Sequence, residues 1–208
     1  MNGSLIQFPD PSEALSKLPA LIVGPLGGVI MTSDGEVETY DIGEIRNIVR
    51  DHDFLVCNRP VAARHLKVDI SGCFDILELF AFIRPSEFCL PLPLGLSTAL
   101  GMPLSSESYE DEATILLKAV QLLFEEVKSA KYGYPEGARS TAFSMSLAEW
   151  NWGPLLLGAM AVVDRPEDYH VWAHLDEWEE KAPLPPPRQD RISEEETRKR
   201  LTELLGVG

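Results

Sequence analysis

The chain has 208 residues, of which 45% are apolar and 25% are charged, and its formal net charge is −15 with a pI of about 4.6. This excess of acid weighs against strong autonomous binding of nucleic acid, which depends on Lys and Arg. No apolar run approaches the ~20 residues that span a bilayer, and the N-terminus lacks the pattern of a secretory signal. We therefore expect a cytoplasmic protein that does not bind a membrane.

The first forty residues predict a short helix followed by an antiparallel meander. Asp10 and Pro11 are typical of the start of a helix, here over 10–18. Three strand-like runs follow within 20–40, namely "ALIVG", "GGVIMT" and "EVETY", and the turn signal "SDG" separates the last two. Such short connections favour antiparallel pairing of neighbouring strands.

Helix and strand patterns alternate through the middle of the chain. Helices are predicted over 43–52 and 74–85, and strands over 54–58 and 68–70. A short helical segment, from Pro60 to Leu66, follows the first of these strands. Strands that alternate with helices indicate an α/β layer fold with a mixed sheet.

The third quarter of the chain predicts helices. The clearest one is "DEATILLKAVQLLFEEV" (111–127), which carries a broad apolar stripe and acids in its first turn. A smaller helix is predicted within 91–105 and ends at Gly101. Residues 131–140 are predicted to form a loop.

The segment 140–163 is mostly helical in pattern. Its sequence "STAFSMSLAEWNWGPLLLGAMAVV" is apolar, and Gly153 and Pro154 are expected to interrupt the helix. Beyond it, four prolines between residues 183 and 187 favour an extended spacer.

One amphipathic segment follows this spacer. Ser193 and Glu196 match a capping box, and Gly206 is a stop signal, so a terminal helix is predicted. A small apolar helix has to pack on some surface, which is either a partner or this same domain. The arrangement suggests a chain cut from a larger protein.

Motifs for phosphate binding and for nucleophilic catalysis are absent from the sequence. "GPLGG" (24–28) lacks the Lys and the hydroxyl of a phosphate loop and is predicted to be a turn. No G-x-S-x-G is present. Cys57, Cys73 and Cys89 are widely spaced among apolar neighbours, which favours buried small hydrophobic residues over zinc or redox chemistry.

Two groups of side chains towards the C-terminus have alternative interpretations. His170 and His174 have i, i+4 spacing and permit a zinc or manganese site, but the motif fixes no third ligand, so a surface-facing pair beside Trp172 is favoured. Four tryptophans lie in the same region: Trp150, Trp152, Trp172 and Trp178. They either stack on single-stranded bases or anchor helices onto the domain, and the acidity of the region favours anchoring.

The ordered series of elements resembles a known nuclease family. "FLVCNRPVAARHL", "FDILELFAFIRP", "PLGLSTALGM" and "DEATILLKAVQLLFEEV" are similar, in this order, to the second half of a DEDD-type 3′–5′ exonuclease domain. "DISGCFDILELFAFIRPSEFCLPLPLGLSTALGMP" resembles still more closely the N-terminal region of bacterial DinG-type ATP-dependent DNA helicases.

This resemblance implies an α/β fold with a ribonuclease-H-like mixed sheet flanked by helices, and a mainly helical C-terminal extension. It divides the chain into an exonuclease-like domain (1–130), a Trp-rich helical extension (131–182), and a Pro-rich linker with a terminal helix (183–208). The linker would lead to a helicase motor outside this sequence. ATP and magnesium are expected only in that motor, and DNA binding is expected to be weak and to depend on the full-length protein.

The acids of the exonuclease reaction are missing from the positions that the resemblance gives them. That reaction needs two metal ions about 3.5–4 Å apart, held by carboxylates. Gly24 and Leu26 stand where an Asp-x-Glu pair should end the first strand. Val61 and Ala62 stand where Phe-Asp should follow Asn58.

Asp111 and Glu112, with Tyr109 nearby, are residual acids near the third expected position. One surviving acid cannot hold two metal ions, so no catalytic residue, metal or cofactor is expected in this chain. Asp69 and Asp75 are not at catalytic places in the pattern.

Three functions remain open. The first is a non-catalytic accessory domain of a DNA helicase, which positions DNA or regulates the motor. The second is an active metal-dependent nuclease with atypical acids, drawn from Asp69, Asp75, Asp111 and Glu112. The third is a protein-interaction module that uses the Trp-rich segment and the acidic face.

Overall fold

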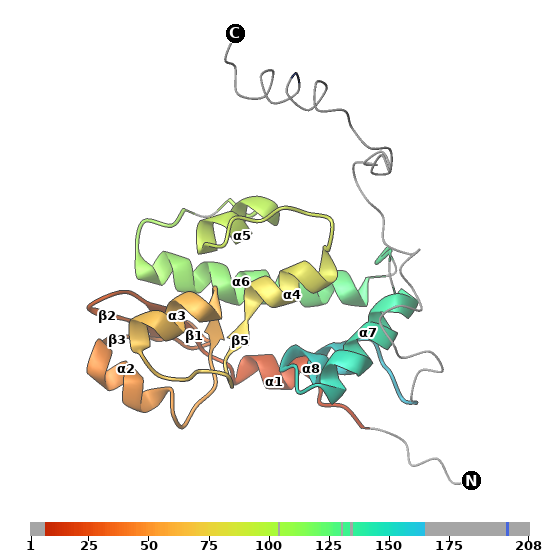
Figure 1. Cartoon of the computed structure of the whole chain (residues 1–208), viewed down its shortest axis with the longest axis horizontal. Helices are drawn as coiled ribbons and strands as arrows, with labels where there is room; N and C mark the ends of the chain where they lie inside the picture. The colour runs from red at the N-terminus through yellow and green to blue at the C-terminus, as the bar shows by residue number, and fades with distance from the viewer. Residues whose placement is uncertain (1–6, 104, 130, 134, 165–198, 200–208) are drawn as a thin grey trace.

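A five-stranded mixed sheet forms the centre of the described structure, with the strand order β3-β2-β1-β4-β5 (Figure 1). This computed structural model describes residues 7–103, 105–129, 131–133, 135–164 and 199. The strands are β1 (Ala20–Val23), β2 (Gly27–Met31), β3 (Val37–Asp41), β4 (Leu55–Val56) and β5 (Phe74–Asp75). β1, β2 and β3 form the predicted antiparallel meander, while β4 pairs in parallel with β1 and β5 in parallel with β4. The predicted α/β class and mixed sheet are confirmed.

Eight helices are present among the described residues. They are α1 (Pro11–Ser16), α2 (Ile42–Ile48), α3 (Arg59–Leu66), α4 (Ile76–Ile83), α5 (Pro93–Ala99), α6 (Tyr109–Lys128), α7 (Pro135–Leu147) and α8 (Trp152–Ala159). Most start where the sequence predicts. The Asp10 carboxylate accepts a hydrogen bond from the Ser12 amide and so caps α1, and Ser108 and Asp111 form a capping box at the start of α6. Within the described part of the chain, no helix is long and apolar enough to cross a bilayer.

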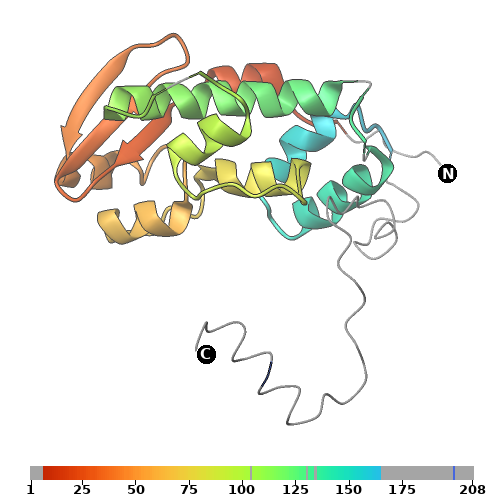
Figure 2. The same ribbon diagram turned by 90° about the horizontal axis from the view of Figure 1, so that it is seen from above.

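Helices cover both faces of the sheet. The long helix α6 crosses one face, whereas α2 and α3 lie on the other (Figure 2). Alternation along the strands separates two cores. Ile22 and Leu55 are buried towards α6 and α4, and Leu21, Ile30 and Val56 are buried towards α2 and α3.

The last strand lies a few residues later than predicted. Residues 68–70 form no strand, and Phe74 and Asp75, which were predicted to begin a helix, pair instead with β4. The carboxylate of Asp75 caps α4, because it accepts a hydrogen bond from the Leu77 amide. The helix therefore begins at Ile76. β4 and β5 are two residues long each, so periodicity cannot locate them.

The C-terminal helices also depart from the prediction. The predicted loop 131–140 is wrong from Pro135 onward, because α7 begins there. The break between the last two helices falls at 148–151, where Glu149 has a φ of 63°, and not at Gly153 and Pro154. Pro154 lies in the first turn of α8, where a helix needs no donor from its backbone nitrogen.

The described part of the segment 131–182 shares the core of the first 130 residues. Ala138 of α7 and Trp152, Leu155 and Leu156 of α8 are buried in the same cluster as the residues of α4 and α6. α8 lies against α1 and α6 (Figure 1). Residues 183–208, where the linker and terminal helix were predicted, lie outside the described residues except for Lys199.

Candidate functional site

A small cavity lies at the carboxyl ends of β1 and β4. Its volume is about 170 Å³. Its lining comes from β1, from the end of β4, from α3, from the start of α5 and from α6: Leu21, Ile22, Val23, Cys57, Asn58, Val61, Ala62, Pro91, Leu92, Pro93 and Glu112. Asn58, Val61, Ala62 and Glu112 thus line one cavity, whereas Gly24 and Asp111 are not among its lining residues. Leu26 lies apart from them, 88% exposed in the turn between β1 and β2.

Tyr109 occupies the space beside Gly24, directly after β1. A Cβ atom added to Gly24 would overlap the hydroxyl oxygen of Tyr109 and lie 3.1 Å from its Cζ. The amide of Gly24 donates to the carbonyl of Gly27 over 2.8 Å, which closes the turn. The hydroxyl end of Tyr109, the first residue of α6, therefore lies beside the place where the resemblance puts the first catalytic acid, and the rest of this side chain is partly exposed.

We predict that Gly24→Ala displaces the partly exposed Tyr109 side chain and lowers the free energy of unfolding by about 1 kcal/mol. In a Tyr109→Ala background, Gly24→Ala should lower the free energy of unfolding by under about 0.5 kcal/mol. The two substitutions should therefore be non-additive in a double-mutant cycle measured by urea unfolding. Gly133→Ala is the matched control, because nothing lies within 4 Å of a Cβ there. Equal costs for Gly24→Ala in both backgrounds would contradict this packing.

Asn58 is the residue before α3 and caps it, but β4 already ends at Val56, two residues earlier than predicted. Its backbone is left-handed, with a φ of 61°, and its side chain accepts from the Val61 amide over 3.4 Å. Ala62 is buried against the sheet, and Val61 is partly exposed at the cavity. Neither residue brings a charge or a metal ligand to this wall.

Asp75 is a buried acid that binds backbone amides. One carboxylate oxygen accepts from the Asn58 amide over 3.2 Å and from the Leu77 amide over 3.0 Å, and the other accepts from the Arg59 amide over 2.7 Å. Its side chain thereby joins the starts of α3 and α4, where helix dipoles also favour a negative charge. This role could not be predicted from local pattern, because the amides of Asn58 and Arg59 lie 17 and 16 residues away in the chain.

The other acids named from the sequence also have hydrogen-bond partners. Asp111 accepts from the amides of Ser108 and Glu107, Glu112 accepts from the Ser106 hydroxyl over 2.7 Å, and Asp69 accepts from Ser71. Among the described residues, no group of three or more His, Cys, Asp or Glu side chains is placed to hold a metal ion.

Comparison with known proteins gives no relative. No family model, no curated protein and no solved structure matches this chain.

The three cysteines lie in apolar surroundings, as predicted. Cys73 is buried, and Cys57 and Cys89 are half-buried and free. Burial raises the pKa of all three thiols; for Cys73 it does so to about 11. Thiols held neutral in this way are poor nucleophiles and poor metal ligands at neutral pH.

Stability should decrease at alkaline pH because of Cys73. Its thiol has an ordinary pKa of 9.0 and a folded pKa of about 11, so above pH 9 the unfolded chain loses a proton that the folded chain keeps. The contribution of the Cys73 thiol to the free energy of unfolding is fully present below pH 9 and is lost as the pH rises towards 11. Between pH 8 and pH 10, the wild-type protein should lose roughly 1 kcal/mol more of its free energy of unfolding than Cys73→Ala does. Parallel pH profiles of the two proteins would contradict this.

Trp150 and Trp152 anchor the C-terminal helices, which was the favoured interpretation. The Trp152 indole donates to the carbonyl of Asp75 over 2.7 Å, and the Trp150 indole donates to Glu78 over 3.0 Å. Between them, the Asn151 amide donates to three carbonyls of residues 71–73. The other two tryptophans and the predicted histidine pair lie outside the described residues: His170, Trp172, His174 and Trp178.

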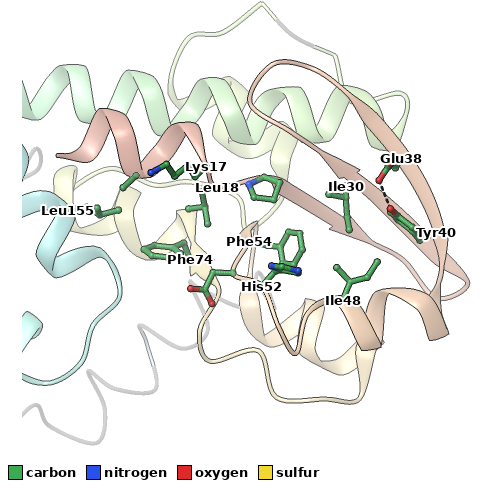
Figure 3. Close-up of a pocket in the computed structure, with 13 residues that line it drawn as sticks. Lys17, Leu18, Ile30, Glu38, Tyr40, Ile48, His52, Phe54, Phe74 and Leu155 are labelled. Carbon is green, nitrogen blue, oxygen red and sulfur yellow. Dashed lines mark hydrogen bonds between the residues drawn. The ribbon is translucent and has the colours of Figure 1, made fainter. Parts of the chain in front are cut away.

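A larger cavity of about 480 Å³ lies at the opposite end of the sheet, near the amino ends of β1 and β4 (Figure 3). Its polar side chains include Lys17, Glu38 and His52. The apolar ones include Leu18, Ile30, Ile48, Phe54, Phe74 and Leu155. The hydroxyl of Tyr40 donates to Glu38, which raises the pKa of Tyr40. These residues come from well-separated parts of the chain, so the sequence gives no signal for this cavity.

Proposed function

We propose that this chain is a non-catalytic accessory domain of an ATP-dependent DNA helicase, built on a ribonuclease-H-like sheet. The ordered resemblance supports the family. The sheet supports the fold, because its meander takes the place of the first three strands of that fold and β4 and β5 extend the sheet beyond β1. Asn58 lies between β4 and α3 and caps α3, which is consistent with the resemblance.

The position of Tyr109 beside Gly24 is the main observation that supports a domain without nuclease activity. A site for two metals needs carboxylates that converge on shared ions. Here Gly24 at the first position lies beside the hydroxyl end of Tyr109 and Ala62 is buried at the second, while Asp75 and Asp111 accept hydrogen bonds from backbone amides. We infer that the domain keeps a nuclease shape without its reaction.

The role that remains is to position DNA or to regulate the attached motor. The net charge of −15 predicts that DNA binds weakly to this domain alone. ATP and magnesium belong to the motor in this proposal, and the expected compartment is the cytoplasm.

Two experiments test the proposal. Labelled single-stranded DNA, incubated with the purified chain and Mg²⁺ or Mn²⁺, should remain intact. Degradation that Asp111→Ala abolishes would support an atypical nuclease instead. The gene should encode G-x-x-x-x-G-K-[ST] downstream of residue 208, and an unrelated continuation would count against the helicase context.

A further inference from the structure

The larger cavity, near the amino ends of β1 and β4, contains none of the residues on which the proposed function depends. Its volume of about 480 Å³ lies within the range of about 300–1,000 Å³ that is usual for sites of small molecules. Such sites combine mostly apolar walls with a few polar groups that orient the ligand. The lining of the larger cavity has this composition.

The apolar walls of the larger cavity belong to the two cores. Leu18, Ile30, Phe54 and Leu155 are each at most 8% exposed, although all four line the cavity. The ring of Phe74, which also lines it, packs edge-to-face against Trp152, with ring centres 4.9 Å apart. These walls are therefore held in place by packing, and a ligand would find them already formed.

Glu38 is the acidic group at one end of the larger cavity. It pairs with Ile30 in the register of β2 and β3, so the two side chains lie next to each other on one face of the sheet. The Tyr40 hydroxyl donates a hydrogen bond to Oε2 of Glu38 (Figure 3). Among the described residues, no donor is bonded to the other oxygen, Oε1. The carboxylate is thus oriented by Tyr40 and keeps one oxygen for a ligand.

The other charges of the lining favour a cation. Lys17 lies at the end away from Glu38 in Figure 3, and its ammonium group is paired with Glu13 over 2.6 Å. Asp53 is a second carboxylate in the lining, and no basic side chain among the described residues is paired with it. His52 is the other basic side chain of the described lining. Two carboxylates without a basic partner therefore make this cavity more favourable for a cation than for an anion.

We propose that the larger cavity binds a small organic amine in its protonated form. The ammonium group donates to Oε1 of Glu38 beside the ring of Tyr40, and the apolar ring or chain of the ligand lies against Ile30, Ile48 and Phe54. Both parts are needed, because an exposed ion pair alone is weak in water and an apolar contact alone does not select for charge. This site is independent of the proposed function.

A titration of the purified chain with phenethylamine, followed by amide NMR spectra, tests the site. The signals of residues 38–40 and 52–54 should shift together and give one dissociation constant. Phenylpropionate carries a similar ring and the opposite charge, so it should bind at least about tenfold more weakly.

Two neighbouring glutamates provide a matched pair of variants. Glu38→Gln should weaken the binding of phenethylamine by about tenfold, because it removes the charge and keeps the shape of the side chain. Glu36→Gln removes the same charge from an exposed side chain outside the described lining, and it should change the affinity by less than about twofold. Ile48→Ala should weaken binding by about threefold through lost apolar contact. Urea unfolding of each variant checks that the fold is kept.

Each further outcome would overturn the proposal. One is the absence of shifts at these signals with about 10 mM phenethylamine, a concentration at which even a fragment-sized ligand of a formed site should bind. Another is equal weakening by Glu38→Gln and Glu36→Gln. Tighter binding of phenylpropionate would assign the cavity to an anion, with Lys17 and His52 as its partners. Tighter binding of N-acetyl-lysine amide than of phenethylamine would assign it to a side chain of a protein partner.

Discussion

Trp152→Ala should lower the free energy of unfolding by about 3–5 kcal/mol, the range for a large aromatic removed from a core. Trp152 is fully buried. Its ring centre lies 4.9 Å from that of Phe74 and 6.0 Å from that of Phe124, so it joins β5 to α6. The substitution also leaves the Asp75 carbonyl without the indole donor that it has at 2.7 Å. Urea unfolding followed by circular dichroism measures the loss.

Trp150→Phe is the matched control for this prediction. It keeps a ring beside Phe82, whose centre lies 5.1 Å away, and removes one hydrogen bond to Glu78. A cost of about 1 kcal/mol is expected. If Trp152→Ala and Trp150→Phe lowered the free energy of unfolding by the same amount, the result would mean that α8 unfolds separately from the sheet, as expected if a domain boundary lies near residue 130.

Local sequence patterns predicted the elements that carry strong local signals. The meander, α1, α2, α3 and α6 lie close to their predicted places. Their signals are local, such as the Asp10 cap of α1, the turn residues of the meander and the apolar stripe of α6. β5 was misplaced because two residues carry no period, and because its pairing with β4 is a contact across the chain. The start of α7 was missed because "YPEG" has the composition of a turn, although Pro135 is well suited to a first helical turn.

The candidate site was predictable in its positions and not in its packing. The resemblance gave Gly24, Asn58 and Ala62 as places of one cleft, and the last two do line one cavity. Tyr109 lies beside Gly24 because of the way α6 packs against the end of β1. The spacing of residues in the sequence does not predict this packing. The exposure of Phe88 was overlooked for a related reason. "EFCLPLPL" has the composition of a buried segment, and only the tertiary structure exposes Phe88.

Asp75→Ala should lower the free energy of unfolding by about 3 kcal/mol, because the amides of Asn58, Arg59 and Leu77 would lose their acceptor in a buried place. Asp75→Asn keeps one acceptor oxygen and should cost less, about 1–2 kcal/mol. Urea unfolding at pH 7 measures both values.

Asp69→Ala is the comparison that separates a structural acid from a catalytic one. Asp69 is exposed and accepts hydrogen bonds only from Ser71, so its removal should cost under about 1 kcal/mol. An atypical nuclease would give a different result: Asp75→Ala and Asp69→Ala would both abolish DNA degradation while leaving the fold nearly as stable as before. If Asp75 is structural, Asp75→Ala should lower the free energy of unfolding strongly, Asp69→Ala should not, and neither substitution should change DNA degradation. This is the result expected of an acid whose hydrogen bonds join the starts of α3 and α4.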